Sequence, residues 1–203
     1  MPVGFVLMLM FRCLFGAALI AGACSSPHTT PADPMTLDFG KSIGAVRSWS
    51  ALNDGVMGGR STGVVDYGRK TMTWAGAVSL ENNGGFSSVR SEWGEQDLSA
   101  FNSVTLLCRT TTGEEDDFTL TMETSQKWWM PYWKANFTAD SEWREVTLPF
   151  SELKKSSAMT GELPKLWTWG DLSDILRIGL MKYDGTAGEF GLEVDWMRFN
   201  PTP

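Results

Sequence analysis

The stretch FTLTME at residues 118–123 alternates apolar and polar side chains without a break, and WKANFT at residues 133–138 repeats the pattern. Successive side chains of a β-strand point to opposite faces, so this period of two predicts two strands that each bury one face. Residues 104–108 and 190–196 alternate in the same way. Because glycine, asparagine, aspartate and proline separate these short runs, the pattern favours an all-β sandwich over alternating strands and helices.

The remaining apolar runs extend this prediction to a whole domain. Further strands are expected at residues 72–80, 86–91, 143–150 and 175–182. The turn NNGG at residues 82–85 predicts a hairpin between the first two of them. Short helices are expected only near residues 151–156 and 169–172. About eight antiparallel strands within residues 36–200 suit a single double-sheet jelly roll.

The composition agrees with a globular domain of this kind. Hydrophobic residues make up 42% of the 203 residues and charged residues 20%. A chain of this length can bury a core without disulfides or a structural metal. The net charge of -7 at pH 7 gives a surface that repels phosphate backbones, so nucleic acid is not expected as a partner.

Residues 1–23 differ from the rest of the chain, because they are apolar except for Arg12 and the sequence turns polar at Cys24. A short apolar run followed by small residues is typical of a signal peptide rather than of a membrane span. The sequence AGAC at residues 21–24 resembles a bacterial lipoprotein box. We therefore expect cleavage before Cys24 and a lipid on its sulfur. An ordinary secretory signal cut at the same bond is the alternative.

Residues 24–35 are rich in serine, threonine and proline, which predicts a disordered tether between the anchor and the domain. Ser25, directly after Cys24, resembles the sorting pattern for the outer membrane. We therefore expect an exported outer-membrane lipoprotein that faces the periplasm and contacts the membrane through the lipid on Cys24.

The sequence offers few residues for catalysis. Its one histidine, His28, falls in the tether, so a Ser-His-Asp triad is not expected. GRSTG at residues 59–63 matches the letters G-x-S-x-G, but no strand-to-helix turn or later histidine accompanies it. Cys108 takes an inward strand position and is expected to be a small core residue. We expect no enzyme; were the protein a hydrolase, Asp54 or Glu81 would be the candidates.

Cofactor and metal sites are not expected either. The glycine-rich residues 53–59 lack the G-x-G-x-x-G spacing that cradles a dinucleotide. With so few histidine and cysteine ligands, a calcium site made of carboxylates is the one metal option, and Asp38 and the acidic run at residues 114–117 could supply its oxygens. A charge run in a loop is usually solvated surface, so the sequence predicts no metal.

Two segments rich in glycine and polar residues, 53–61 and 81–90, carry more information than a plain sandwich needs. Their glycines allow sharp bends, and Asp54 can accept hydrogen bonds from backbone amides. If the segments pack together, Arg90 could pair with Asp54 or Glu81 and complete a polar platform. A binding platform and a purely fold-specifying set of turns are equally open. The candidate binding residues of this polar platform are Asn53, Asp54, Glu81, Asn83 and Arg90.

The sequence WWMPYW at residues 128–133 places four aromatic residues within six positions. Alternation sends Trp133 inward, while Pro131 marks an edge strand or a loop and leaves its aromatic neighbours facing solvent. Exposed aromatic rings stack on sugars or anchor protein partners. The alternative is a loop tucked over the end of the barrel. The candidate binding residues of this aromatic loop are Trp128, Trp129 and Tyr132.

Longer blocks of the sequence carry a family resemblance. WSALNDGVMGGRS at residues 49–61 and GAVSLENNGGFSSVR at residues 76–90 resemble the two signature blocks of the complex I intermediate-associated protein family. The resemblance continues through residues 133–137, 143–150, 178–181 and 190–196. It implies a galactose-binding-like β-sandwich without catalytic activity, and the mitochondrial members of the family are assembly chaperones for respiratory complex I. TTGEEDDF at residues 111–118 departs from the usual Gly-Asp-Gly turn of the family.

These observations predict a non-enzymatic binding or assembly module, anchored by lipid in the bacterial envelope and without a cofactor. An exported protein would not meet assembly intermediates inside the cell, so the resemblance is taken for the fold and not for the complex I role. The leading expectation is a protein partner bound at the polar platform. The alternative is a carbohydrate-binding module that stacks a glycan on the aromatic loop.

Overall fold

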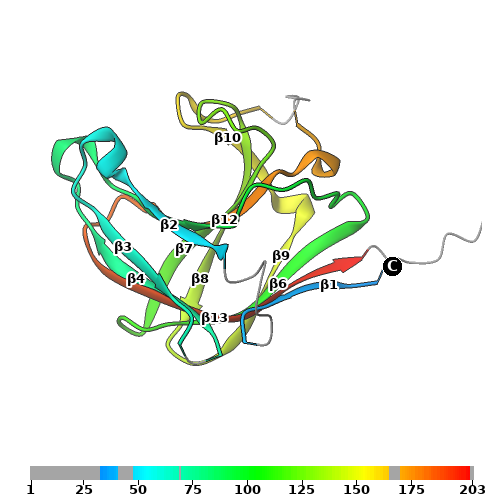
Figure 1. The fold of residues 1–203 in the computed structure, drawn as a ribbon, viewed down its shortest axis with the longest axis horizontal. Coiled ribbons are helices and arrows are strands. Elements are labelled where there is room, and N and C mark those ends of the chain that lie inside the picture. Colours follow the sequence, from blue (N-terminus) through cyan, green and yellow to red (C-terminus); the bar gives the residue numbers. More distant parts are fainter. Residues whose placement is uncertain (1–32, 41–47, 69, 165–169, 202–203) are drawn as a thin grey trace, which may run out of the picture. The chain divides into compact units, whose positions relative to one another are not determined.

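The structure of this chain, a computed structural model, describes residues 33–40, 48–68, 70–164 and 170–201 (Figure 1). The strands are β1 (Met35–Asp38), β2 (Ser50–Asn53), β3 (Thr62–Asp66), β4 (Met72–Val78), β5 (Ser87–Arg90), β6 (Phe101–Thr110), β7 (Glu115–Glu123), β8 (Tyr132–Asp140), β9 (Arg144–Pro149), β10 (Lys154–Ser157), β11 (Gly161–Glu162), β12 (Arg177–Lys182) and β13 (Gly188–Pro201). Short 3-10 helices are η2 (Asp54–Met57), η3 (Glu81–Asn83), η4 (Phe150–Glu152) and η5 (Leu172–Asp174). Among the described residues, no helix is long and apolar enough to cross a membrane.

The strands form two antiparallel sheets that make a sandwich, which confirms the predicted all-β fold (Figure 1). The six-stranded sheet has the order β3-β4-β13-β6-β9, with β1 paired to β13. The seven-stranded sheet has the order β11-β10-β8-β7-β12-β5-β2. Neighbouring strands in each sheet are mostly distant in sequence, as in a jelly roll.

The core lies between the two sheets and consists of the side chains that the alternation points inward. Phe118, Leu120 and Met122 of β7 are buried, and β12 buries Ile178 and Leu180 beside them. Each fully buried apolar side chain of this size contributes about 1.5–3 kcal/mol to stability. The period of two at residues 118–123 therefore corresponds to a real division between core and outer face.

Trp74 of β4 joins the two sheets through ring contacts. Its indole lies 4.8 Å from the ring of Phe190 on β13 and 5.9 Å from the ring of Phe118 on β7, centroid to centroid. The indole Nε1 donates a hydrogen bond to Ser87 Oγ at 3.3 Å, so its polar atom is not left unpaired in the core. Trp74 is thus a central packing residue rather than a candidate binding residue.

The polar side chains of the same strands form the outer face of the seven-stranded sheet, which is turned away from the core. The register places Thr121 of β7 between Gly179 of β12 and Lys134 of β8, and it places Gly179 beside Arg90 of β5. Thr121 is almost fully buried although it points away from the core. The centre of this outer face is therefore shielded by its surroundings instead of lying open as a flat surface.

The turn at residues 82–85 does not close the predicted hairpin. Asn82 and Asn83 take left-handed conformations, with φ of 58° and 57°, so the sharp bend is present. However, β4 pairs with β3 and β13, whereas β5 pairs with β2 and β12. The connection therefore crosses from one sheet to the other. The hairpin prediction is wrong because turn residues specify a bend without specifying which strand the chain joins next.

The two predicted helices are also mostly wrong. Residues 151–156 contain only the end of η4, and from Lys154 the chain runs as strand β10 beside β8. Near residues 169–172 the structure has η5, although residue 169 lies outside the described residues. Good helix formers at residues 152–155 are overridden because pairing with β8 supplies the backbone hydrogen bonds.

Three strands before Met72 were not predicted. β1 and β2 have only four residues each, too few to display an alternation. β3 reads TGVVD and includes a glycine, which is unusual in strands. The described strands therefore outnumber the eight or so that the sequence suggested.

Most of the predicted N-terminal features lie outside the described residues, namely the signal peptide at residues 1–23, the lipidation site Cys24 and the tether up to residue 32. Met35, predicted as the last residue of the tether at residues 24–35, instead begins β1 and pairs with Phe199 of β13. Its apolar side chain packs against the core, which explains why it belongs to the domain.

Candidate functional site

Asp54 ties the two glycine-rich segments together. Its carboxylate accepts hydrogen bonds from the amide of Ser61 at 2.9 Å, the hydroxyl of Ser61 at 2.5 Å, and the amides of Gly85 at 2.7 Å and Phe86 at 3.2 Å. Burial alone would raise the pKa of Asp54, but these hydrogen bonds outweigh burial and lower it. The side chain is 1% exposed, so a ligand cannot reach it. Asp54 is therefore a clamp within the fold.

Two glycines make this clamp possible. A Cβ at Gly59 would lie 2.3 Å from the carboxyl carbon of Asp54, and a Cβ at Gly84 would lie 2.6 Å from one of its oxygens. Both contacts are far shorter than real Cβ contacts. The glycines of the signature segments thus serve close packing around one carboxylate.

The predicted pairing of Arg90 with Asp54 or Glu81 is wrong. Glu81 pairs with Arg60 at 2.8 Å on the exposed surface, while Arg90 lies on the outer face of the seven-stranded sheet and pairs with Glu123. Asp54 needs no cation because backbone amides already stabilise its charge. The residues of the predicted polar platform therefore do not form one site: Asp54 acts as a clamp within the fold, and Arg90 lies apart from it on the outer face.

The two asparagines of the platform serve the backbone. Asn53 donates to the carbonyl of Gly63 at 3.2 Å and accepts from the hydroxyl of Ser87 at 2.7 Å, which connects β2, β3 and β5. Asn83 is exposed within η3 and forms part of the turn. Asn53 thus acts within the fold, like Asp54.

The three candidate residues of the aromatic loop also differ in exposure to solvent. Trp128 and Trp129 are 61% and 48% exposed and contact each other edge to face, with ring centroids 5.9 Å apart. Tyr132, predicted to face solvent, is instead half-buried on β8, opposite Glu123 of β7. Burial raises the pKa of Tyr132, although its hydrogen bond with Ser156 and the charge of Arg90 oppose the rise.

Arg90 and Tyr132 belong to one group of side chains that we name the outer-face cluster; its members are Arg90, Trp93, Glu123, Tyr132 and Arg177. Glu123 is central. Arg177 donates from Nε to its Oε1 at 3.2 Å and from Nη2 to its Oε2 at 2.7 Å, and Arg90 donates from Nη1 to Oε1 at 3.2 Å. The side chains of Arg90, Glu123 and Arg177 are 19%, 15% and 16% exposed. The cluster is therefore shielded yet reachable.

Each arginine of the cluster has its own support. The guanidinium carbon of Arg177 lies 3.7 Å from the centre of the Trp93 ring. Arg90 donates from Nε to the hydroxyl of Ser88 at 2.9 Å, and its Cγ lies close above Gly179, where a Cβ would come within 3.1 Å. Burial lowers the pKa of Arg90, the charge of Glu123 raises it, and the charge of Arg177 lowers it further. Both side chains are thus held in place before any ligand binds.

Sequence reasoning missed three members of this cluster: Trp93, Glu123 and Arg177. The sequence did contain a signal for two of them. Glu123 takes a polar, outward-facing position at the end of the alternation at residues 118–123, and Arg177 takes the same kind of position at the start of residues 177–182. The register of β7 with β12, which pairs Arg177 with Glu123, cannot be read from either run alone.

Two hollows open along β8, and Asn136 lines both. The first, of about 610 Å³, is lined by residues of β7 and β8 and by Tyr183, Asp184 and Gly185. The second, of about 470 Å³, lies between β8, β10 and residues 148–153. Asn136 is four residues from Tyr132 on the same face, about 13 Å along the strand. The first hollow thus lies on the outer face beyond Tyr132, whereas the second opens where β8 meets the end of β9, at the edge between the two sheets.

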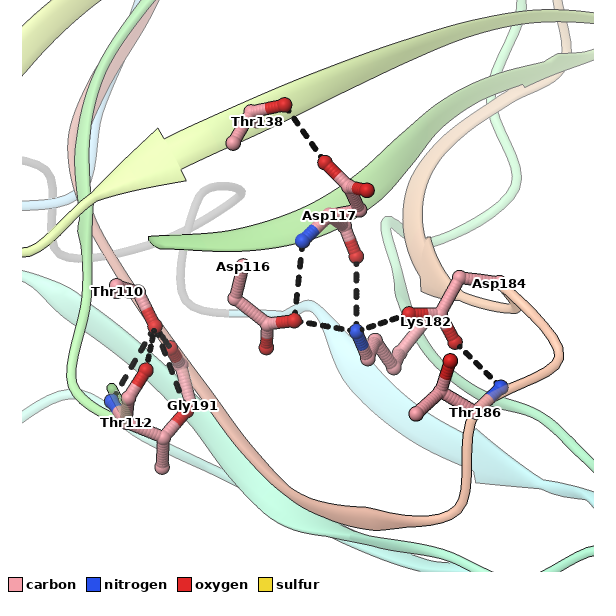
Figure 2. Close-up of polar contacts among 9 residues, drawn as sticks. All are labelled: Thr110, Thr112, Asp116, Asp117, Thr138, Lys182, Asp184, Thr186 and Gly191. Carbon is pink, nitrogen blue, oxygen red and sulfur yellow. Dashed lines mark hydrogen bonds and ion pairs between the residues drawn. The ribbon is translucent and has the colours of Figure 1, made fainter. Parts of the chain in front are cut away.

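The acidic run at residues 114–117 was the predicted calcium option. One of its residues, Asp116, instead forms an ion pair with Lys182. Figure 2 shows the ammonium of Lys182 between Asp116 and Asp184. Its Nζ donates hydrogen bonds to one oxygen of each, at 2.5 Å and 2.6 Å. Burial alone would lower the pKa of Lys182, but the two carboxylates raise it. Across the described ranges, no group of three or more histidine, cysteine or carboxylate side chains is placed to hold a metal ion.

The remaining reactive residues do not form a site. Cys108 is buried in the core, and burial raises its pKa to about 12, so its thiol stays protonated and unreactive. His28 lies outside the described residues.

Solved structures with a similar fold include carbohydrate-binding modules. A family 11 module from Clostridium thermocellum, in complex with a beta-1,3-1,4-mixed-linked tetrasaccharide, has a TM-score of 0.61 and 16% identity, over 83% of this chain and 96% of that chain. A family 30 module of a cellulosomal cellulase of the same organism has a TM-score of 0.51 and 13% identity, over 82% and 98%. At such identities the similarity concerns the fold alone.

Sequence comparison identifies the family. No curated protein matches the chain in sequence. Residues 37–194, which are most of the chain, match the family model described as Complex I intermediate-associated protein 30. The chain therefore belongs to the complex I intermediate-associated protein 30 family.

Proposed function

We propose that this protein is a non-catalytic binding module that holds a glycan on the outer face of its seven-stranded sheet. The observation that carries the proposal is the outer-face cluster, where charged hydrogen-bond donors lie directly beside aromatic rings. Sugars need both, because their hydroxyl groups form hydrogen bonds and their C–H faces pack on aromatic side chains.

The arginines of the cluster keep donors for a ligand. A guanidinium has five N–H groups. Within the described part of the chain, Arg90 and Arg177 each use two of them on protein acceptors, which leaves three on each. Because these side chains are already fixed, little conformational entropy is lost when a ligand binds.

The outer face has room for further sugars beyond the cluster, although no member of the cluster lines either hollow along β8. The two hollows along β8 lie within the size range of ordinary ligand sites, about 300–1,000 Å³. The fold supports the same assignment, since the similar modules include one whose structure holds a tetrasaccharide. Complete burial of Asp54 argues against the clamp as a ligand-binding group.

A glycan array probed with the full chain tests the proposal, followed by affinity measurement on the best ligand for two matched variants. Trp93→Ala removes the ring beside Arg177 and is expected to weaken binding at least about fivefold. Trp143→Ala is the control, because Trp143 stacks on Arg109 at 5.0 Å and Arg109 pairs with Glu193 at 2.6 Å in the six-stranded sheet. No bound glycan, or equal losses in the two variants, would contradict the proposal.

A protein partner is the second candidate, favoured by exposed apolar residues beside the clamp. Val56 and Met57 of η2 are 70% and 68% exposed. Asp54 begins η2 and fixes it, so these side chains are presented on a rigid turn. This candidate agrees with the association with a complex I intermediate that the family description names. Crosslinking in native envelopes should capture a partner that Met57→Ser loses and that Met159→Ser, at the equally exposed Met159, retains.

Export and lipid anchoring belong to this proposal as well. A lipid on Cys24 would hold the binding domain at the periplasmic face of the outer membrane. Labelling with palmitate tests this step, and the label should disappear in Cys24→Ala. Label that survives the substitution, or no label in the wild-type protein, would contradict the anchor.

A further inference from the structure

We propose that the glycan held by the outer-face cluster is acidic, with a carboxylate that binds between Arg90 and Arg177. This inference rests on the proposed function and adds the chemical class of the ligand. It follows from the charge, the geometry and the shielding of the cluster.

The cluster has a surplus of positive charge. Arg90 and Arg177 bring two guanidinium groups to a single carboxylate, that of Glu123. The surplus stands against the net charge of -7 of the whole chain, which on average would repel an anion. A local cationic patch in an acidic protein needs a specific reason, and charge complementarity to a ligand supplies one.

The two guanidinium groups are held side by side by one oxygen atom. Arg90 Nη1 and Arg177 Nε both donate to Oε1 of Glu123, each at 3.2 Å. Like charges this close repel each other: burial is the main cause that lowers the pKa of Arg90, Glu123 opposes it, and the charge of Arg177 lowers the pKa further. A second carboxylate, supplied by the ligand, would balance the charge of the group.

Each guanidinium keeps one terminal nitrogen that donates to no protein acceptor in the described part of the chain. Arg177 uses Nε and Nη2 on Glu123 and packs on Trp93, so its Nη1 remains for a ligand. Arg90 uses Nε and Nη1, so its Nη2 remains. A planar guanidinium binds carboxylates with parallel hydrogen bonds, and shielding from water strengthens them.

A neutral glycan would not need this arrangement. Hydroxyl groups accept single hydrogen bonds that one arginine, or an amide such as that of Asn136, can supply. Two arginines around one glutamate carry a desolvation cost that neutral sugars would not offset. The carboxylate is therefore the group that distinguishes the expected ligand from neutral sugars.

Three uronate polymers serve as probes: polygalacturonate, alginate and hyaluronan, each also prepared as its methyl ester. The full chain is expected to bind at least one acid form about tenfold or more tightly than the matching ester, because esterification replaces the charged carboxylate by a neutral group on the same sugar backbone. Raising the salt concentration from about 50 to about 500 mM screens charges more strongly. It should weaken binding of the acid form and leave the affinity for neutral mixed-linkage glucan unchanged.

Variants test the assignment to residues. Arg177→Gln and Arg90→Gln should each weaken binding of the acid form about tenfold. Arg109→Gln, in the matched Trp143–Arg109–Glu193 group of the other sheet, should change it less than about twofold. Thermal melting checks that each variant is folded, and the ester comparison on the wild-type protein decides the matter without any variant.

The outcomes separate the inference from the function on which it rests. Equal binding of acid and ester forms, or tighter binding of neutral glucan, overturns the acidic ligand and keeps the glycan module. Absence of binding to every acid, ester and neutral probe overturns both.

Discussion

Arg90 and Arg177 share one oxygen of Glu123, with Arg90 Nη1 and Arg177 Nε each 3.2 Å from its Oε1. The three residues come from β5, β12 and β7, which are neighbours in the seven-stranded sheet. This contact joins a residue that the sequence marked as a binding candidate to two that it did not. It also sets the position of the candidate glycan site.

Gly179 keeps space for Arg90, so we expect Gly179→Ala to disturb the site. The new Cβ would lie 2.9 Å from Thr121 Oγ1 and 3.1 Å from Arg90 Cγ. We expect a several-fold loss of glycan affinity with a modest loss of stability, about 1–2 kcal/mol. Gly94→Ala is the control because nothing lies within 4 Å of its Cβ position. Unchanged affinity in Gly179→Ala, measured by calorimetry, would argue against the placement of Arg90.

Asp54→Asn should destabilise the fold by about 1–3 kcal/mol at pH 7, because amides that now bind a buried carboxylate would lose a strong acceptor. The pKa of Asp54 is lowered in the folded state, so its contribution is present above the ordinary value of 3.8 and is lost as the pH falls through the lowered value. Urea unfolding at several pH values measures both effects.

Asp97→Asn is the matched control for this experiment. Asp97 also accepts hydrogen bonds from the amide and hydroxyl of a nearby serine, Ser99, but it is exposed. Its substitution should change stability little. If the difference in free energy of unfolding between the wild-type protein and Asp54→Asn stayed constant down to strongly acidic pH, the role of the Asp54 carboxylate as a clamp would be contradicted.

Lys182→Met should destabilise the protein by about 3 kcal/mol at neutral pH, since Asp116 and Asp184 would lose their buried cation. The folded pKa of Lys182 is raised, so its contribution is present below the ordinary value of 10.5 and is lost as the pH rises through the raised value. Thermal melts across this range measure it. Lys154→Met, which removes an exposed ion pair with Glu162, should have less than about 0.5 kcal/mol of effect; equal effects would contradict the account.

Cys108 should react with a thiol reagent only after unfolding. Burial raises its pKa to about 12, and its side chain has no access to solvent. The rate of labelling should therefore follow the fraction of unfolded protein across a urea titration. Rapid labelling of Cys108 in native buffer would show that this part of the core opens.

Much of the fold could be predicted because alternation is a local property of the sequence. The alternation at residues 118–123 shows which side chains point to the core, and Phe118, Leu120 and Met122 are buried as expected. Residues 82–85 display a bend, but whether the next strand continues in the same sheet depends on distant partners such as β12 and β13. The fold class was therefore predictable, and the strand order was not.

The candidate site was only partly predictable for the same reason. Asp54 and Arg90 stand out in the sequence, yet the first is buried by backbone amides from residues 85 and 86, and the second finds its partner on β7. Which carboxylate meets which cation is decided by strand register. Sequence alone therefore identified candidate residues without showing which of them meet.

Nuclear magnetic resonance of the full chain, titrated with a glycan that it binds, tests the central claim most directly. We expect the largest shifts at the indole of Trp93, at Nε of Arg90 and Arg177, and at the backbone of β7 and β12. Shifts confined to the aromatic loop at Trp128 and Trp129, or to η2 at Val56 and Met57, would contradict the outer face as the binding surface.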